Sequence, residues 1–159
     1  MFSAQLTRAT RGAIVLQRTF SHSSLAQKSF PALVREIDAT NKNIHHITPK
    51  DLHTSLAASS TPHVVDVRER NEIDRTGTIP GAIPLPRGIL ERDIGKFIPQ
   101  DDPRDVVVYC AGGFRSILAA ESLTRLGYGT GESEAKNKVY SLDEGMEGWI
   151  KSGFSVEKK

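Results

Sequence analysis

Residues 105–116 read Asp-Val-Val-Val-Tyr-Cys-Ala-Gly-Gly-Phe-Arg-Ser, and this stretch decides the expected fold. Its first six residues form the most apolar of the expected strands, as is typical of the middle of a parallel sheet. Two glycines then permit a tight turn, and residues 116–126 carry apolar side chains at helical spacing. Gly127 is positioned to end this helix. A buried strand, a turn and a helix in this order indicate an α/β fold.

Cys110 is the only cysteine of the chain, and it stands at the carboxyl end of the expected strand. Ligands of an open α/β sheet bind outside these strand ends. Backbone N–H groups and a helix dipole at such a position stabilise a thiolate and an anionic substrate. We therefore interpret Cys110 as a candidate nucleophile, with a small buried hydrophobic residue as the alternative. A single cysteine also excludes an intrachain disulfide framework.

The remaining segments alternate between strand-like and helix-like patterns. Strands are expected at residues 44–47, 64–67, 82–85, 105–110 and 139–142, and helices after Thr48 and at 70–75, 89–97 and 116–126. Thr48, Pro49 and Asp51 supply an N-cap, a first-turn proline and an acid three positions after the cap. This alternation predicts a single α/β domain, with an open, mainly parallel sheet flanked by helices on both faces.

Four segments, in this order, resemble the signatures of the rhodanese family of sulfurtransferases. They are residues 66–72, residues 77–86, the loop 110–116 and residues 139–149. The loop is similar to the family pattern Cys-Arg-x-Gly-x-Arg-Ser. These segments spread over about two-thirds of the chain. The resemblance points to a single-domain mitochondrial rhodanese, a thiosulfate sulfurtransferase, with its rhodanese domain at residues 44–157.

The resemblance implies covalent sulfur transfer at Cys110. A sulfane sulfur moves from thiosulfate, or a related donor such as glutathione persulfide, onto Cys110, and the resulting persulfide passes it to a thiol or cyanide. The implied substrate-binding residues are Ala111, Gly112, Gly113, Phe114, Arg115 and Ser116. The implied partners are thus a small-molecule sulfur donor and a thiol acceptor, and neither a cofactor nor a metal is implied.

Individual residues of the loop have distinct expected roles. Gly112 and Gly113 let the backbone curl, so that its N–H groups point at the thiolate and the anionic donor. Arg115 supplies positive charge, with an exposed arginine in the first helical turn as the alternative. Ser116 caps the following helix or donates to the same anion. Outside the loop, a charged cluster under the site is expected to be structural rather than catalytic. It consists of Asp66, Arg68 and Glu72.

The chain departs from the commonest family pattern at three positions. Thr78 replaces a usual histidine, which we interpret as structurally tolerable. Ala111 and Phe114 stand where the family often has basic residues. Because thiosulfate is a dianion, the loss of these charges is expected to weaken its binding. A less charged donor such as glutathione persulfide therefore becomes more credible.

Two alternative functions remain open. A cysteine phosphatase or arsenate reductase on the same type of fold uses a Cys-x5-Arg loop, whereas Cys110 and Arg115 are separated by four residues. The shorter loop makes a tighter cradle, which suits a persulfide better than a phosphoryl group. A non-catalytic rhodanese-like module that binds partners is the other alternative. Such modules commonly lack the cysteine, so the presence of Cys110 counts against this alternative without excluding it.

Composition limits the other classes of function. The 159 residues are 25% charged and 38% hydrophobic, which is ordinary for a globular protein. Five of the 21 basic residues lie in the first 35 positions, so 16 basic residues face 19 acidic ones in the remainder. This mildly acidic remainder does not favour nucleic-acid binding. No apolar run has the length of an integral membrane segment.

The N-terminal segment is typical of a mitochondrial transit peptide. Residues 1–28 are rich in Ser, Thr and Arg, lack acidic side chains and place apolar residues on one helical stripe. We expect residues 29–43 to form a linker. Mitochondrial import machinery and a processing peptidase are the implied partners, and the matrix is the expected compartment. A disordered basic tail is the alternative interpretation.

A polar loop at residues 128–138 is longer than this connection usually is in the family. We interpret it as a solvated insertion, because surface loops tolerate added residues at little cost. An additional rim for a protein partner is the alternative.

The transit-peptide interpretation predicts the mature N-terminus. Arg18 to Ser21 resembles a matrix-processing site, with cleavage after Phe20. A cut after Thr19, followed by removal of the octapeptide from Phe20 to Gln27, also fits. N-terminal sequencing of the protein from purified mitochondria is expected to begin at Ser21 or Lys28. A cytosolic protein that retains Met1 would contradict the prediction.

Overall fold

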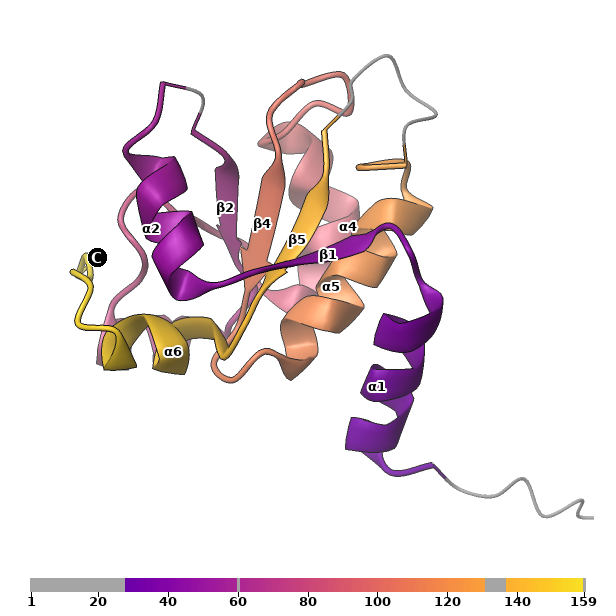
Figure 1. Ribbon diagram of the computed structural model, residues 1–159, viewed down its shortest axis with the longest axis horizontal. Helices are drawn as coiled ribbons and strands as arrows, with labels where there is room; N and C mark the ends of the chain where they lie inside the picture. The colour runs from indigo at the N-terminus through magenta and orange to yellow at the C-terminus, as the bar shows by residue number, and fades with distance from the viewer. Residues whose placement is uncertain (1–27, 60, 131–136, 159) are drawn as a thin grey trace, which may run out of the picture.

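A computed structural model describes residues 28–59, 61–130 and 137–158. Its centre is a five-stranded sheet in the order β1-β5-β4-β2-β3, in which every pairing is parallel (Figure 1). The strands are β1 (Ile44–Ile47), β2 (His63–Asp66), β3 (Ile83–Pro84), β4 (Val106–Tyr109) and β5 (Val139–Leu142). The strand that carries the expected nucleophile, β4, is the middle one.

Helices cover both faces of the sheet, as the sequence predicted. Helices α2 (Pro49–Leu56) and α6 (Gly145–Lys151) pack on one face, and α1 (Phe30–Thr40), α4 (Leu90–Asp93) and α5 (Phe114–Arg125) lie on the other (Figure 1). Helix α3 (Arg70–Thr76) follows β2. The predicted α/β fold class is therefore confirmed.

The core consists of two apolar layers that the alternating side chains of β4 connect. Val106, Val108 and Cys110 belong to the layer beneath α5. Val107 and Tyr109 belong to the layer beneath α2 and α6. Because successive side chains of a strand point to opposite faces, this alternation directs the Cys110 side chain toward α5. The position of the thiol is therefore a consequence of strand register.

The predicted helix at residues 89–97 is broken into three short pieces. A 3-10 turn at Arg87–Ile89 precedes α4, and a second one at Ile94–Lys96 follows it. Glycines at positions 88 and 95 lie within these turns and have low helix propensity. The other predicted elements are present, with ends that shift by one or two residues.

The predicted linker at residues 29–43 is wrong in part, because it contains helix α1. Ser29 is the N-cap residue, and Pro31 lies in the first turn, where a missing N–H costs little. Val34 is fully buried and Ile37 packs against the layer beneath α5. The spacing of these apolar residues was a helical signal, and contact with α5 stabilises the helix.

Helix α6 was not predicted as a helix, and its position depends on the cysteine loop. Two of its seven residues are glycines, so its intrinsic propensity is low. Its first N–H groups instead find partners in the loop: Met146 N donates to Cys110 O at 2.8 Å, and Glu147 N donates to Ala111 O at 3.0 Å. The loop thus satisfies N–H groups at the helix start that have no partner within the helix.

Parts of two expectations lie outside the described residues. They are the presequence, except for Lys28, and residues 131–136 of the polar loop. Over the ranges that the structure does describe, no helix is long and apolar enough to cross a membrane.

The close contact between α6 and the loop predicts that Gly145 cannot be replaced. A Cβ atom at Gly145 would lie 2.3 Å from Cys110 O and 2.7 Å from Ala111 O. The φ angle of Gly145 is also positive, +51°. We expect Gly145→Ala to lower the free energy of unfolding by about 2 to 5 kcal/mol, from backbone strain and overpacking together.

Gly153→Ala is the matched control, because its φ is +76° but no atom lies within 4 Å of the added Cβ. This variant is expected to lower the free energy of unfolding by only about 1 to 2 kcal/mol, because it introduces backbone strain alone. Urea denaturation of both variants measures the difference. Equal losses would show that the contact with the loop carbonyls is unimportant.

Candidate functional site

Cys110 lies directly after β4 and is almost completely buried, with 2% of its surface exposed. Its Sγ atom accepts a hydrogen bond from Gly113 N at 3.2 Å. The thiol also lies 3.8 Å from Ser116 Oγ. The Gly113 N–H is therefore aimed at the sulfur atom that would react. The wider cradle of N–H groups around a bound anion stays a prediction.

The turn after Cys110 depends on the left-handed backbone of Gly113, whose φ is +94°. Gly113 is the N-cap of α5, so the helix begins at Phe114, two residues earlier than predicted. Ser116 therefore lies within the first turn and is not the cap. Its hydroxyl donates to Gly113 O at 2.7 Å and accepts from Ser141 Oγ at 2.9 Å. The buried Ser116 hydroxyl thus connects the loop to β5.

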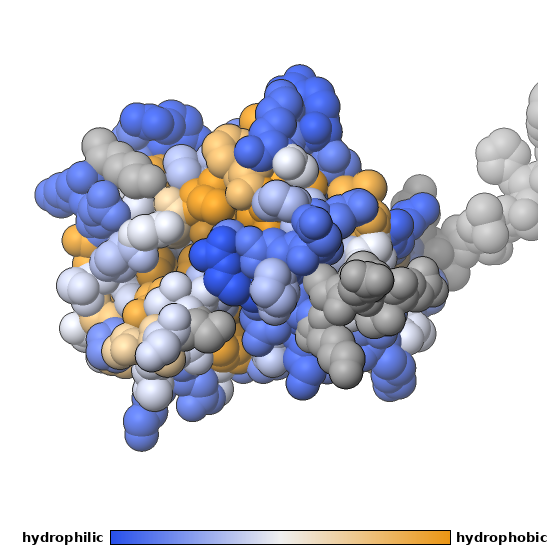
Figure 2. Space-filling model, turned by 90° about the horizontal axis from the view of Figure 1, so that it is seen from above, coloured by the Kyte–Doolittle hydropathy of each residue, from blue (hydrophilic) through white to orange (hydrophobic). Residues whose placement is uncertain are grey.

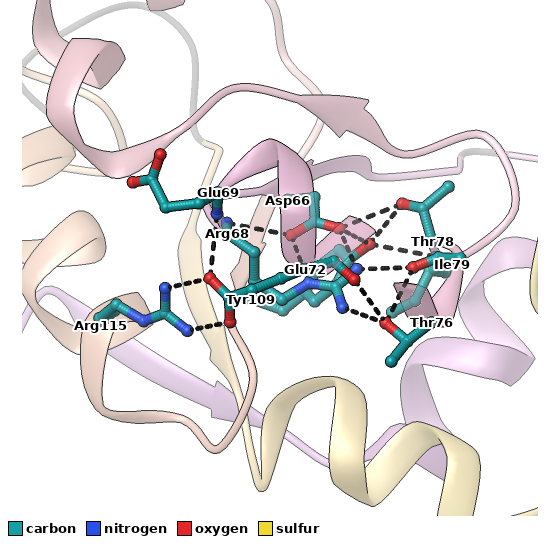
Figure 3. A network of polar contacts seen from close by, with 10 residues as sticks. Asp66, Arg68, Glu69, Glu72, Thr76, Thr78, Ile79, Tyr109 and Arg115 are labelled. Atoms are coloured by element: carbon teal, nitrogen blue, oxygen red, sulfur yellow. Dashed lines mark hydrogen bonds and ion pairs between the residues drawn. The ribbon is translucent and has the colours of Figure 1, made fainter. Parts of the chain in front are cut away.

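Arg115 is held at the site by a two-pronged ion pair with Glu72. Its two terminal nitrogens lie 2.7 Å from the two oxygens of the Glu72 carboxylate (Figure 3). These hydrogen bonds raise the pKa of Arg115, and the nearby Cys110 thiol contributes in the same direction. Hydrogen bonding to Arg115 also lowers the pKa of Glu72, to about 2, although burial opposes the shift. Arg115 is therefore charged, but its guanidinium already interacts with the Glu72 carboxylate.

A buried network around Asp66 lies behind this pair (Figure 3). Arg68 donates to both Asp66 oxygens, from Nε at 2.9 Å and from Nη2 at 2.6 Å. The Tyr109 hydroxyl donates to Asp66 at 2.7 Å, and Thr78 Oγ1 lies 3.2 Å from the same carboxylate. Thr78, which replaces the usual histidine, therefore completes a buried hydrogen-bond network.

The network has clear electrostatic consequences. Burial disfavours the charge of Arg68, but its hydrogen bonds and charge interaction with Asp66 outweigh burial and raise the pKa of Arg68. Burial, together with the Asp66 charge, raises the pKa of Tyr109. Arg68 therefore stays charged and Tyr109 stays neutral. The cluster predicted from Asp66, Arg68 and Glu72 consists of this buried pair and the Glu72 carboxylate nearer the loop.

Arg68 links the buried pair to helix α3. Its Nη1 atom donates to Thr76 Oγ1 at 2.7 Å, and its Nη2 atom donates to Gly77 O at 2.7 Å. Thr76 Oγ1 in turn donates to the carbonyl of Glu72 at 3.0 Å. The buried ion pair thereby fixes the helix that presents Glu72 to Arg115.

The outer side of the loop borders a cavity of about 180 Å³. Its walls are residues 112–114 of the loop, Ile117, residues 141–144 and His46. Phe114 is 43% exposed, and its ring centroid lies 6.2 Å from that of Phe30 on α1. The other predicted loop residues differ in exposure: Gly112 is exposed, whereas Ala111 and Gly113 are half-buried.

Sequence reasoning missed several residues around this cavity. The two ring nitrogens of His46 on β1 lie within hydrogen-bond distance of two carboxylates, Asp143 at 2.9 Å and Asp38 of α1 at 2.8 Å. Burial opposes the charge of His46, but the hydrogen bonds to both carboxylates raise its pKa. These residues are up to about a hundred positions apart in the chain, and no local pattern connects them.

Other surface features bear on where a ligand could bind. A larger hollow of about 410 Å³ is lined by residues of α2 and of β1, β4 and β5. It shares His46 with the smaller cavity, but none of residues 110–116 borders it. In Figure 2, which views the ends where β2 and β4 begin, polar residues surround a band of apolar ones. Among the described residues, no group of His, Cys, Asp and Glu is arranged to hold a metal ion. The cysteine loop therefore remains the best candidate.

These features define an α/β protein with a buried cysteine at the carboxyl end of its central strand. Residues 48–152 match the rhodanese-like domain family. The chain is 33% identical, over 113 residues, to a sulfurtransferase of Allochromatium vinosum, and the alignment covers 71% of this chain and 94% of that protein. The chain therefore belongs to the rhodanese-like domain family.

Solved structures are also similar. A protein of unknown function from Rhodopseudomonas palustris, described as a possible tyrosine phosphatase, has a TM-score of 0.64 and 32% identity, with 82% of this chain and 96% of that chain covered. A thiosulfate sulfurtransferase from Pseudomonas aeruginosa has a TM-score of 0.63 and 27% identity. The match covers 80% of this chain but 22% of that longer chain.

The Glu72–Arg115 pair predicts a pH-dependent contribution to stability. The pKa of Glu72 is lowered from its ordinary 4.5 to about 2, so its charged form stabilises the folded state. This contribution is complete above pH 4.5 and is lost as the pH falls from 4.5 toward 2. At neutral pH, we expect Glu72→Gln to lower the free energy of unfolding by about 1 to 2 kcal/mol, because solvent screens the partly exposed pair.

Urea denaturation at a series of pH values is the measurement. The gap between wild type and Glu72→Gln is expected to close below pH 4.5. Glu121→Gln is the control, since Glu121 pairs with Arg125 at 3.6 Å on an exposed surface. A gap that persists at pH 2 would show that the Glu72 charge is not the cause.

Proposed function

We propose that this protein is a sulfurtransferase that carries sulfane sulfur as a persulfide on Cys110. The observation that carries the proposal is the buried Cys110 sulfur, which accepts a hydrogen bond from Gly113 N and lies beside the charged Arg115. Membership of the rhodanese-like family and similarity to a sulfurtransferase support it.

The proposed reaction has two steps that use one sulfur atom of the enzyme. The Cys110 thiolate attacks the outer sulfur of thiosulfate, the S–S bond of the donor breaks, and sulfite leaves with the bonding electron pair. An acceptor thiolate or cyanide then attacks the outer sulfur of the persulfide, and the Cys110 thiolate leaves. Both steps are substitutions at sulfur, so no external oxidant or second cysteine is required.

The charge of the loop affects which sulfur donors it can bind. Arg115 is the one basic residue between positions 110 and 116, and Glu72 already shares its charge. We therefore propose that donors less charged than thiosulfate, such as glutathione persulfide, are used alongside it. The acidic-residue-free N-terminal segment supports the further proposal that this chemistry takes place in mitochondria, with the matrix as the compartment.

Phosphatase activity is the second candidate, because the similar Rhodopseudomonas protein is described as a possible tyrosine phosphatase. The loop geometry favours sulfur transfer instead. Only four residues separate Cys110 from Arg115, and Glu72 holds both terminal nitrogens of Arg115 that a phosphoryl group would need. A non-catalytic module that binds partners is the third candidate function, and the experiments below also test it.

The proposal predicts a covalent intermediate on Cys110. After incubation with thiosulfate, mass spectrometry of the intact protein is expected to show a species heavier by one sulfur atom. Cyanide should remove the added mass and yield thiocyanate. Cys110→Ser should abolish both the adduct and thiocyanate formation, because the chain contains no other thiol.

An aryl phosphate assay under the same conditions separates the alternatives. Turnover of the phosphate ester without persulfide formation would favour the phosphatase. A well-folded wild type that is inactive with thiosulfate, glutathione persulfide and the aryl phosphate would favour the binding module. Sulfur transfer that survives in Cys110→Ser would overturn the covalent mechanism.

A further inference from the structure

The cavity beside the cysteine loop has the dimensions of a small organic group. Its volume is about 180 Å³, whereas pockets for whole drug-sized ligands are roughly 300 to 1,000 Å³. Gly112 and Gly113 form part of its wall, and Gly113 is the residue whose N–H contacts the Cys110 sulfur. A group that occupies the cavity therefore lies against the backbone that holds the reactive atom.

One side of this cavity is apolar. Phe114, Ile117 and Leu142 contribute to its lining. Phe30 of α1 packs near Phe114, although both rings remain about half exposed. Helix α1 lies outside residues 48–152, the part of the chain that matches the family. This aromatic contact lies at the rim of the site and involves a helix outside that range.

The other side of the cavity carries negative charge. Asp143 and Glu144 belong to its lining, and their side chains are 43% and 66% exposed. His46 lies between Asp143 and Asp38, so a single imidazole faces two carboxylates. Glu144 has only a loose contact with Lys151, at 3.6 Å between two exposed side chains. The net charge beside the apolar wall is therefore negative.

We propose that this cavity is a subsite for the organic part of the acceptor thiol, and that it selects thiols with an ammonium group on a short aliphatic stem. The stem contacts Phe114 and Ile117, and the ammonium group faces Asp143 and Glu144. The inference rests on the proposed sulfur transfer and adds the class of acceptor. Acceptors with a carboxylate in the same place meet like charges and bind less well.

The transfer step itself is a balanced substitution. The acceptor thiolate attacks the outer sulfur of the Cys110 persulfide and forms a new S–S bond. The S–S bond to Cys110 breaks, its electron pair returns to Cys110 as a thiolate, and the acceptor leaves as a persulfide. The subsite contributes orientation and charge selection, and neither changes the balance of the reaction.

Three acceptors of similar size and different charge test the proposal. They are cysteamine, which is cationic, 2-mercaptoethanol, which is neutral, and 3-mercaptopropionate, which is anionic. Turnover is measured with thiosulfate as donor, through sulfite release, and kcat/KM is compared per thiolate. We expect cysteamine to exceed 3-mercaptopropionate by about threefold to tenfold, a range set by partly exposed charges that salt screens.

The variants identify the source of this preference. Asp143→Asn combined with Glu144→Gln is expected to reduce the ratio of cysteamine to 3-mercaptopropionate to less than about twofold, since both charges are removed. Glu144→Gln alone, at an exposed position, is expected to reduce it partly. Asp101→Asn is the matched control, because Asp101 is exposed and precedes β4 at the opposite end of the sheet. This control should keep the wild-type ratio.

Cyanide as acceptor separates failure of the subsite from failure of the proposed function. Cyanide has no organic part, so wild type and every variant are expected to turn it over, whether or not the subsite is intact. Normal cyanide turnover with no preference among the three thiols would overturn the subsite alone. A preference that the Asp143 and Glu144 variants leave unchanged would also overturn it. Absence of turnover with cyanide and all thiols would overturn the proposed function.

Discussion

The buried ion pair between Asp66 and Arg68 is the contact on which the arrangement of the site depends. Both side chains are almost fully removed from solvent, where loss of one partner costs about 3 to 5 kcal/mol. Two neighbouring hydroxyl groups satisfy the rest of the carboxylate. Arg68 also holds Thr76 at the end of α3. Because α3 carries Glu72, this core contact determines where Glu72 meets Arg115.

A second constraint acts on the same loop from the other side of the sheet. The carbonyls of Cys110 and Ala111 accept hydrogen bonds from the start of α6, so loop and helix each satisfy polar groups of the other. Gly145 permits this approach because it has no Cβ. The cysteine loop is thus held between α3, through Arg115, and α6, through its backbone. These contacts fix the position of the Cys110 side chain.

The local pattern of the chain was sufficient to predict most of the sheet and to single out Cys110 as the candidate nucleophile. Strands β1, β4 and β5 and the helix after Thr48 depend on local hydrophobic patterns, turn glycines and the Thr48 N-cap, which act over a few residues. Cys110 followed from a lone thiol at the end of the most apolar strand. Helix α6 was missed because its glycines disfavour a helix, and its stability comes from contacts with a distant loop.

The sequence by itself determined the α/β class, the order of the elements and the place of the lone cysteine at a strand end, because each depends on neighbours in the chain. Only the tertiary structure decided that Arg115 shares its charge with Glu72, forty-three positions earlier. The same holds for His46, which lies between carboxylates of α1 and of the segment after β5. Electrostatic interactions depend on distance in space, and the fold sets that distance for residues that no local pattern connects.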